Sequence, residues 1–286
     1  MTAPTPPPPS PTPGPPAAAP PPAAAAGSGR SLAPPFVAIV SYTLRACLPA
    51  KRWWGVALPC LGAVLFGWLS LLPDGPRAEA FGVVARLGLF GLILPLTCLV
   101  IGDAVMGADI RAGTFPLTWL SPVSLRSIAI GRWFGGWLVA LVTLVPALVL
   151  ATVVGDFPET AGAMALAGAA GSAAYVALFV MLGTWVRRSA VWALAIVFLG
   201  ERLLGGVLSG IAQLSPMWEA QQVYVGMDLD FWSPWCDSSD ADVGCLVREG
   251  TPNGWGAVVR LAIIVVVTLA VATWRLRRLR PTGGDE

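Results

Sequence analysis

The stretch DIRAGTFPLTWLSPVSLR, from Asp109 to Arg126, lies between two long apolar runs and decides how the chain is organised. Within it, Gly113-Thr114 predicts a helix break, because glycine adopts backbone angles that other residues avoid. Thr114 can then cap a new short helix, whose first turn tolerates Pro116. A short helix between two apolar runs is expected at a face of the membrane.

A second start signal follows at Ser121-Pro122, where serine can act as the N-cap and proline as the first helical residue. Two start signals so close together predict a short separate helix followed by a longer one. The short helix carries Phe115 and Trp119 on an otherwise polar stretch. We therefore interpret it as a docking element.

The order and spacing of these residues resemble the permease subunits of ABC-2 type ABC transporters. Asp109 stands where that family usually has Glu, and Gly113-Thr114 matches it in type and spacing. The Pro-Val-Ser group that begins at Pro122 also matches, and Gly131-Arg132 stands for the usual Gly-Lys.

The sequence departs from the family pattern at three places. Arg111 and Pro116 replace two frequent acids, and Leu125 separates the Val-Ser pair from the basic Arg126. The resemblance implies a cytoplasmic coupling helix between spans two and three that contacts a separate ABC ATPase subunit. The residues expected to contact this subunit or to shape the helix are Asp109, Arg111, Gly113, Thr114, Trp119, Pro122 and Arg126.

The resemblance also sets expectations for partners and direction. The chain would pair with itself or with a similar permease, as a homodimer or heterodimer, and would export rather than import. ATP and Mg²⁺ would be held by the ATPase subunit, and this chain would hold no cofactor and no metal.

Composition supports a membrane location independently of any family. The 286 residues are 56% hydrophobic and 12% charged, whereas an ordinary soluble domain is about 25% charged. A net charge of +2 is too small to suggest a nucleic-acid partner. The chain has no His, a single lysine (Lys51) and no Gly-x-x-x-x-Gly-Lys-Ser/Thr sequence, so it shows no nucleotide-binding loop of that kind.

The apolar runs predict an all-α membrane protein with six transmembrane helices, each near the ~20 residues that a bilayer requires. The domain covers 36–280, with spans at about 53–72, 81–105, 128–154, 161–186, 190–212 and 257–274. Residues 1–35 are rich in Pro and Ala and are expected to be a disordered tail. We expect 213–256 to be an extracytoplasmic loop and 281–286 a C-terminal tail.

The basic residues predict the orientation. Thirteen of the 18 Lys and Arg residues fall on one predicted face and two on the other. The positive-inside rule then places both termini and the docking stretch in the cytoplasm of a multi-pass cell-membrane protein.

Polar residues within or beside the spans are candidates for function, since intramembrane charge is costly. Asp103 lies near the inner end of the second span. The pair Glu201-Arg202 either lines a cavity, partners other helices or marks an early break of the fifth helix. Arg86 and Arg260 lie near the outer boundary, where their side chains can reach water.

The outer loop carries two further candidates. Cys236 and Cys245 can form a disulfide if the loop faces an oxidising compartment. Its aromatic residues, which include Trp218, Tyr224 and Trp255, are typical of an interfacial belt, and a substrate-exit surface is the alternative.

The sequence therefore favours a permease subunit energised by a separate ATPase. The alternative is a non-transporting polytopic anchor or assembly protein. An intramembrane enzyme is disfavoured, because the chain has no His, no Gly-x-Ser-x-Gly and no Asp-rich motif within a span.

Overall fold

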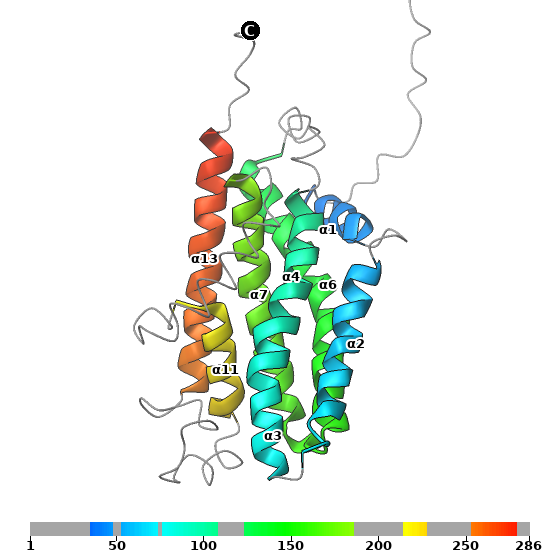
Figure 1. Cartoon of the computed structure of the whole chain (residues 1–286). Coiled ribbons are helices and arrows are strands. Elements are labelled where there is room, and N and C mark those ends of the chain that lie inside the picture. Colours follow the sequence, from blue (N-terminus) through cyan, green and yellow to red (C-terminus); the bar gives the residue numbers. More distant parts are fainter. Residues whose placement is uncertain are drawn as a thin grey trace, which may run out of the picture. The chain divides into compact units, whose positions relative to one another are not determined.

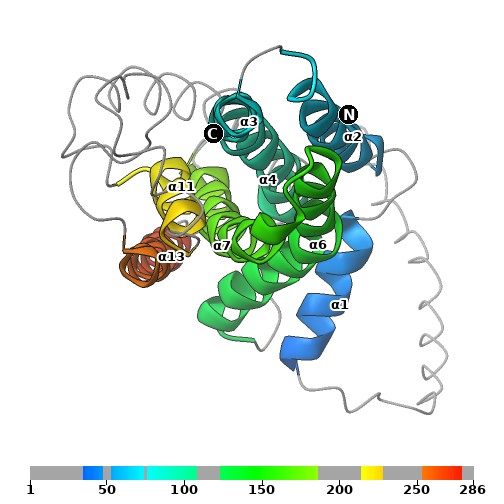
Figure 2. The ribbon, with the colours of Figure 1, turned by 90° about the horizontal axis from the view of Figure 1, so that it is seen from below.

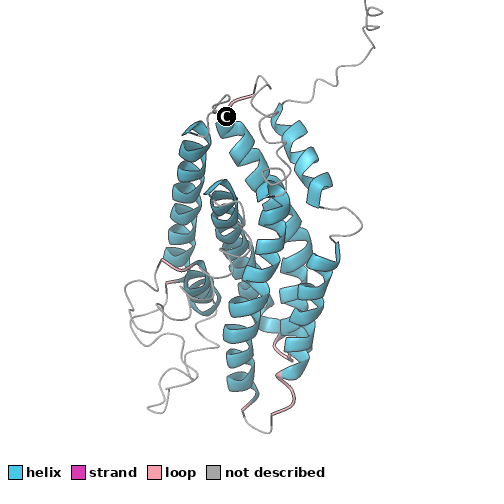
Figure 3. Ribbon diagram, turned by 45° about the horizontal axis from the view of Figure 1, so that its top comes forward, coloured by secondary structure: helices cyan, strands magenta, loops and turns pink. Residues whose placement is uncertain are grey.

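Apolar segments can lie in lipid only if their backbone groups bond within the segment, and a helix achieves this. The computed structural model describes residues 35–47, 53–73, 76–107, 123–185, 214–227 and 253–278. All regular structure in these ranges is helical (Figure 3). The α-helices are α1 (Pro35–Cys47), α2 (Trp53–Leu69), α3 (Arg77–Val84), α4 (Leu94–Gly102), α6 (Leu125–Val154), α7 (Ala161–Trp185), α11 (Pro216–Met227) and α13 (Gly254–Arg278) (Figure 1).

Four of the six predicted spans are confirmed as helices long and apolar enough to cross a membrane. They cover Arg77–Gly107, Leu125–Val154, Pro158–Trp185 and Gly254–Arg278. Each contains or closely matches its predicted apolar run, and each starts a few residues earlier than the run. These four helices are consistent with a membrane protein.

The first predicted span, 53–72, is a shorter helix than expected. α2 has 17 residues, which is roughly 25 Å of helix against a hydrocarbon core of about 30 Å. The chain leaves the helix in a turn, in which Leu71 N donates to Trp68 O and Leu72 N to Leu69 O. The predicted fifth span, 190–212, and the predicted docking helix lie outside the described residues, as do residues 1–34 of the predicted tail.

The second span is one continuous helix with two widened turns. π-helical segments η1 (Ala85–Ile93) and η2 (Asp103–Gly107) precede and follow α4. Pro95 lies in the first turn of α4. Proline lacks an N–H and its ring crowds the preceding turn, so a widened turn before Pro95 accommodates it.

Asp156 shapes the turn between α6 and α7. Asp156 has φ 71°, a left-handed conformation that Asp tolerates better than most residues. Its carboxylate accepts from Arg77 Nη1 at 3.0 Å, and both side chains are exposed. The short 3-10 helix η4 (Pro158–Thr160) then leads into α7.

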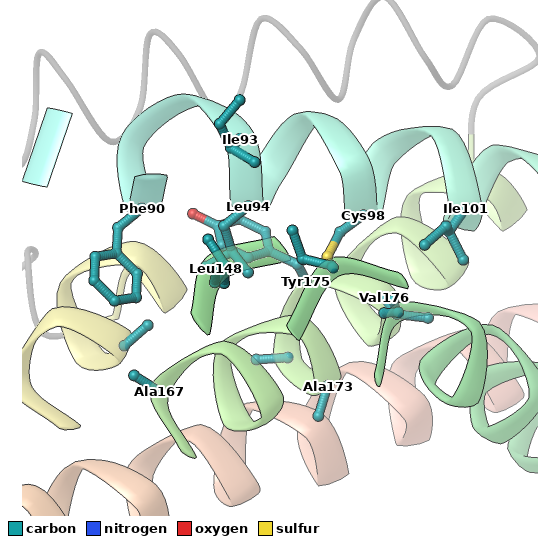
Figure 4. Packing of buried hydrophobic residues seen from close by; sticks show 14 of the residues in the cluster. Phe90, Ile93, Leu94, Cys98, Ile101, Leu148, Ala167, Ala173, Tyr175 and Val176 are labelled. Atoms are coloured by element: carbon teal, nitrogen blue, oxygen red, sulfur yellow. The ribbon is translucent and has the colours of Figure 1, made fainter. Parts of the chain in front are cut away.

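α7 lies at the centre of the helices, with α4, α6, α11 and α13 packed around it (Figure 2). It is rich in Gly, Ala and Ser, and small residues let neighbouring backbones approach closely. Figure 4 shows the contact with the second span, where Leu94, Cys98 and Ile101 face α7 residues such as Tyr175 and Val176, while Phe90 lies beside α11.

The predicted extracytoplasmic loop, 213–256, contains a helix that the sequence analysis did not foresee at residues 216–227. They form α11, which packs against α7 and α13. Tyr224, expected in an interfacial belt, is instead fully buried, and its hydroxyl hydrogen-bonds Thr160 Oγ1 at 3.1 Å. Trp255 is exposed, as a belt residue would be.

Candidate coupling site

The described chain resumes at Val123, within the last residues of the predicted docking stretch 109–126. α6 begins at Leu125, and Ser124 is its N-cap: the backbone of Ser124 is extended and its hydroxyl accepts from Ser127 N at 3.2 Å. The prediction of Ser121 as the N-cap of the longer helix is therefore wrong by three residues. Arg126, in the first turn, is exposed.

Two turns further on, α6 contacts three neighbours through three pairs of residues spaced four apart. We call Gly131, Arg132, Trp133, Gly135, Gly136 and Trp137 the α6 junction. On a helix, residues four apart lie on one face, so each pair addresses one neighbour.

The first pair, Gly131 and Gly135, receives α1. A Cβ placed on Gly131 would lie 2.9 Å from Ile39 Cγ2, and one on Gly135 would lie 2.8 Å from Thr43 Cβ. Both distances are shorter than real Cβ contacts allow, so α1 can pack here only because both positions lack a side chain.

The second pair, Arg132 and Gly136, receives the end of the second span. Arg132 is 5% exposed, and its Nη1 donates to Val105 O at 2.8 Å. The same nitrogen lies 3.7 Å from Met106 Sδ. Gly136 leaves room for Val105, whose Cγ2 would be 2.9 Å from an added Cβ.

Arg132 also connects α1 to this contact. Its guanidinium lies 5.7 Å from the centroid of the Tyr42 ring, which is within cation–π distance. One buried arginine of α6 therefore touches both η2 and α1. Charged groups are almost never buried without partners. Moving η2 or α1 away would leave the buried guanidinium of Arg132 without its partners, so Arg132 holds α6, η2 and α1 in one arrangement.

The third pair, Trp133 and Trp137, faces α7. Their Nε1 atoms donate to Ala173 O at 2.9 Å and Ala169 O at 3.0 Å. The two rings stack 5.7 Å apart with 5° between their planes. Since both hydrogen bonds run to successive turns of α7, they fix the two antiparallel helices against sliding.

The α6 junction thus joins α1, η2 and α7 close to both ends of the predicted docking stretch, which leaves the described chain after Gly107 and returns at Val123. A displacement of that stretch would act on η2 and on the start of α6, and the junction would carry it to α1 and α7. Arg132 was expected only as the basic residue that stands for Lys in the Gly-Lys pair of the family pattern, and its burial was not predicted. The signal for its burial was its position within an apolar run beside a Gly-x-x-x-Gly pair.

Other predicted site residues fall as follows. Asp103 begins η2 and is half-buried. Asp109, Arg111, Gly113, Thr114, Trp119 and Pro122 lie outside the described residues, and so do Glu201, Arg202, Cys236 and Cys245. The structure therefore brings Arg126 and Asp103 to the same end as the α6 junction and leaves the others as predictions.

A buried ion pair that sequence analysis missed lies at the other end, between α11 and α13. Glu219 is fully buried, and its Oε2 lies 3.1 Å from Arg260 Nε, while the Arg260 side chain is 43% exposed. Neither carboxylate oxygen accepts a hydrogen bond within the described residues. The Arg260 side chain was expected to extend to water, with no protein partner. Glu219 had been assigned to a loop, so no partner was foreseen.

Burial raises the pKa of Glu219 from 4.5 to about 7, against the opposing effect of Arg260. Of the elements packed on α11, α7 carries no charged residue, and η1 carries Arg86, whose carbonyl accepts from Gln221 Nε2 at 3.2 Å. Because the pKa of Glu219 is higher in the folded chain than in the unfolded chain, protonation of this carboxyl stabilises the fold. That contribution is fully present below about pH 4.5 and is lost as the pH rises through about 7.

The described chain is thus an all-helical assembly with four helices long and apolar enough to cross a membrane. The α6 junction holds three of them together at one end, namely Arg77–Gly107, Leu125–Val154 and Pro158–Trp185. No model of a known protein family matches the chain, and no curated protein matches it either.

Proposed function

We propose that this chain is the membrane-spanning permease subunit of an ATP-driven transporter of the ABC-2 type, working as an exporter and energised by a separate ATPase. The observation that carries the proposal is the docking motif of residues 109–126, which falls between two candidate membrane-crossing helices that the α6 junction holds together.

The proposed mechanism is mechanical transmission. The ATPase docks on the helix at about 109–120 and moves it when ATP binding closes the ATPase subunits. Movement passes into η2 and the start of α6, and Arg132 keeps these two elements and α1 together. The Trp133 and Trp137 hydrogen bonds carry the shift to α7, the central helix.

The proposal includes six spans with both termini in the cytoplasm. Support comes from the directions of α7 and α13. Arg275, near the C-terminal end of α13, stacks on Trp185 at the C-terminal end of α7, so the two C-terminal ends lie together and the helices run parallel. Gly226 of α11 contacts Gly254 at the opposite end of α13. The chain between Trp185 and Gly226 thus joins opposite ends of α13, as a fifth crossing requires.

The partners in this proposal are an ABC ATPase, which supplies the ATP and Mg²⁺ site, and a second permease chain of the same or similar kind. The cell membrane is the proposed location. A non-transporting anchor remains the competing function, and it predicts no ATPase bound through residues 109–126.

Co-purification tests the proposal. The tagged chain should retain an ABC ATPase when extracted in mild detergent, and the double substitution Gly113→Val and Thr114→Val should reduce its recovery at least tenfold. Arg77→Gln, an exposed change at the other end of the helices, is the matched control and should retain it. Equal recovery with all three chains, or no ATPase with the wild type, would reject the proposal.

A further inference from the structure

The parallel ends of α7 and α13 bring together arginine and tryptophan side chains that the proposed mechanism does not use. The Arg275 guanidinium lies 5.5 Å from the centroid of the Trp185 ring and so bridges the two helices. The Arg278 guanidinium lies 4.1 Å from the Trp274 ring. We call these four residues the Arg–Trp cluster.

Within the described ranges, no acid forms an ion pair with the arginines of the cluster. Arg275 Nε is buried and has no hydrogen-bond partner among the described residues. Arg277 and Arg278 are exposed in the last turn of α13. Stacking on an indole face fixes the plane of a guanidinium and leaves its N–H edge available to an oxyanion.

Both indoles are open to the surroundings, with Trp185 54% and Trp274 48% exposed. Tryptophan at such positions is typical of the boundary between hydrocarbon and headgroups. The cluster therefore lies at the level where lipid phosphates are found.

An exposed apolar stripe leads along α13 to the cluster. Val259, Ile263, Val266 and Val267 are each more than half exposed, and Trp274 follows on the same helical face. A ligand that fits the whole feature needs an anionic group for the guanidinium edges and a long apolar tail for the stripe. An acidic protein surface or free phosphate offers only the first of these.

We propose that the Arg–Trp cluster is a binding site for the phosphate of an anionic phospholipid, whose acyl chains lie along the exposed stripe of α13. Arg275 and Arg278 donate to the phosphate, and Trp185 and Trp274 hold the two guanidinium groups in place. Basic groups near the membrane surface each favour anionic lipid by about 1 kcal/mol, roughly fivefold in affinity.

Native mass spectrometry of the detergent-purified chain tests this site. The probe is palmitoyl-oleoyl phosphatidylglycerol, compared with phosphatidylcholine of the same acyl chains. We expect the wild type to prefer phosphatidylglycerol, and the double variant Arg275→Gln and Arg278→Gln to lose about 25-fold of that preference. The control with equal charge loss is Arg45→Gln with Arg77→Gln, which should keep it.

Two further measurements distinguish a lipid phosphate from free phosphate as the bound anion. Millimolar inorganic phosphate should displace less than half of the bound phosphatidylglycerol; complete displacement would overturn the assignment to a lipid. Trp274→Leu keeps every charge but should weaken phosphatidylglycerol binding several-fold, which keeps the test decisive if the double variant is unstable. An equal preference for phosphatidylglycerol in the wild type, the double variant and the control would overturn the proposal. So would a double variant that loses a bound protein partner while its lipid binding is unchanged.

Discussion

Replacing Arg132 by methionine tests whether one side chain holds three helices together. Methionine has a similar length but cannot donate to Val105 O or stack as a cation on Tyr42. A hydrogen bond to a charged group contributes about 1.5–3 kcal/mol, and a cation–π contact to an exposed ring such as Tyr42 about 0.5–1 kcal/mol. We expect Arg132→Met to destabilise the chain by about 2–4 kcal/mol.

Thermal unfolding in lipid nanodiscs measures this change. At about 2–4 °C for each kcal/mol in a chain of this size, the expected fall in Tm is roughly 4–16 °C. Arg126→Met, an exposed change in the first turn of the same helix, should shift Tm by no more than about 2 °C. Arg132→Lys retains a charged donor and should fall between the two.

Hydrogen exchange adds a local readout. Arg132→Met should lower protection in residues 103–107 and 131–137 and leave α13 unchanged. If the Tm of Arg132→Met equals that of the Arg126→Met control and hydrogen exchange at η2 does not change, then Arg132 does not hold η2 on α6. The proposed transmission of movement through Arg132 would then be wrong.

Other predictions concern the ends of α11 and α2. Glu219→Gln should flatten the pH dependence of Tm, because the wild type loses up to about 3 kcal/mol of folding free energy as the pH rises from 5 to 8. The control Glu159→Gln, at an exposed position, should retain that dependence. A wild-type Tm that does not change with pH would contradict the argument from burial of Glu219. Gly67→Ala should lower Tm clearly, because its Cβ would lie 2.4 Å from the backbone oxygen of Ala151. Gly62→Ala, where the added Cβ meets a side-chain end at 3.0 Å, should cost much less, and equal costs would show that the contact between α2 and α6 is not tight.

The four helices that are long and apolar enough to cross a membrane could be predicted because a membrane leaves few alternatives for long apolar runs. Lipid offers no hydrogen-bond partners, so such runs must be helical. Their approximate limits followed from charged and turn-forming residues such as Asp156.

The features that sequence analysis missed depend on contacts distant in the chain. α11 contains Glu219 and two glutamines, which made it resemble a polar loop, and it is buried by α7, α13 and η1, which lie elsewhere in the chain. Arg132 is buried by Val105, 27 residues earlier. The N-cap of α6 shifted because Ser121 and Ser124 are both acceptable cap residues, and local preference alone does not choose between them.

The sidedness of the docking stretch tests the central claim most directly. With the five native cysteines replaced by serine or alanine, a single cysteine is placed at Thr114, and another chain carries one at the exposed Asn253 as the opposite-side control. A membrane-impermeant maleimide is applied to intact cells and to inverted vesicles. The account predicts that position 114 reacts only in inverted vesicles and position 253 only in intact cells, and reaction of position 114 from outside intact cells would contradict it.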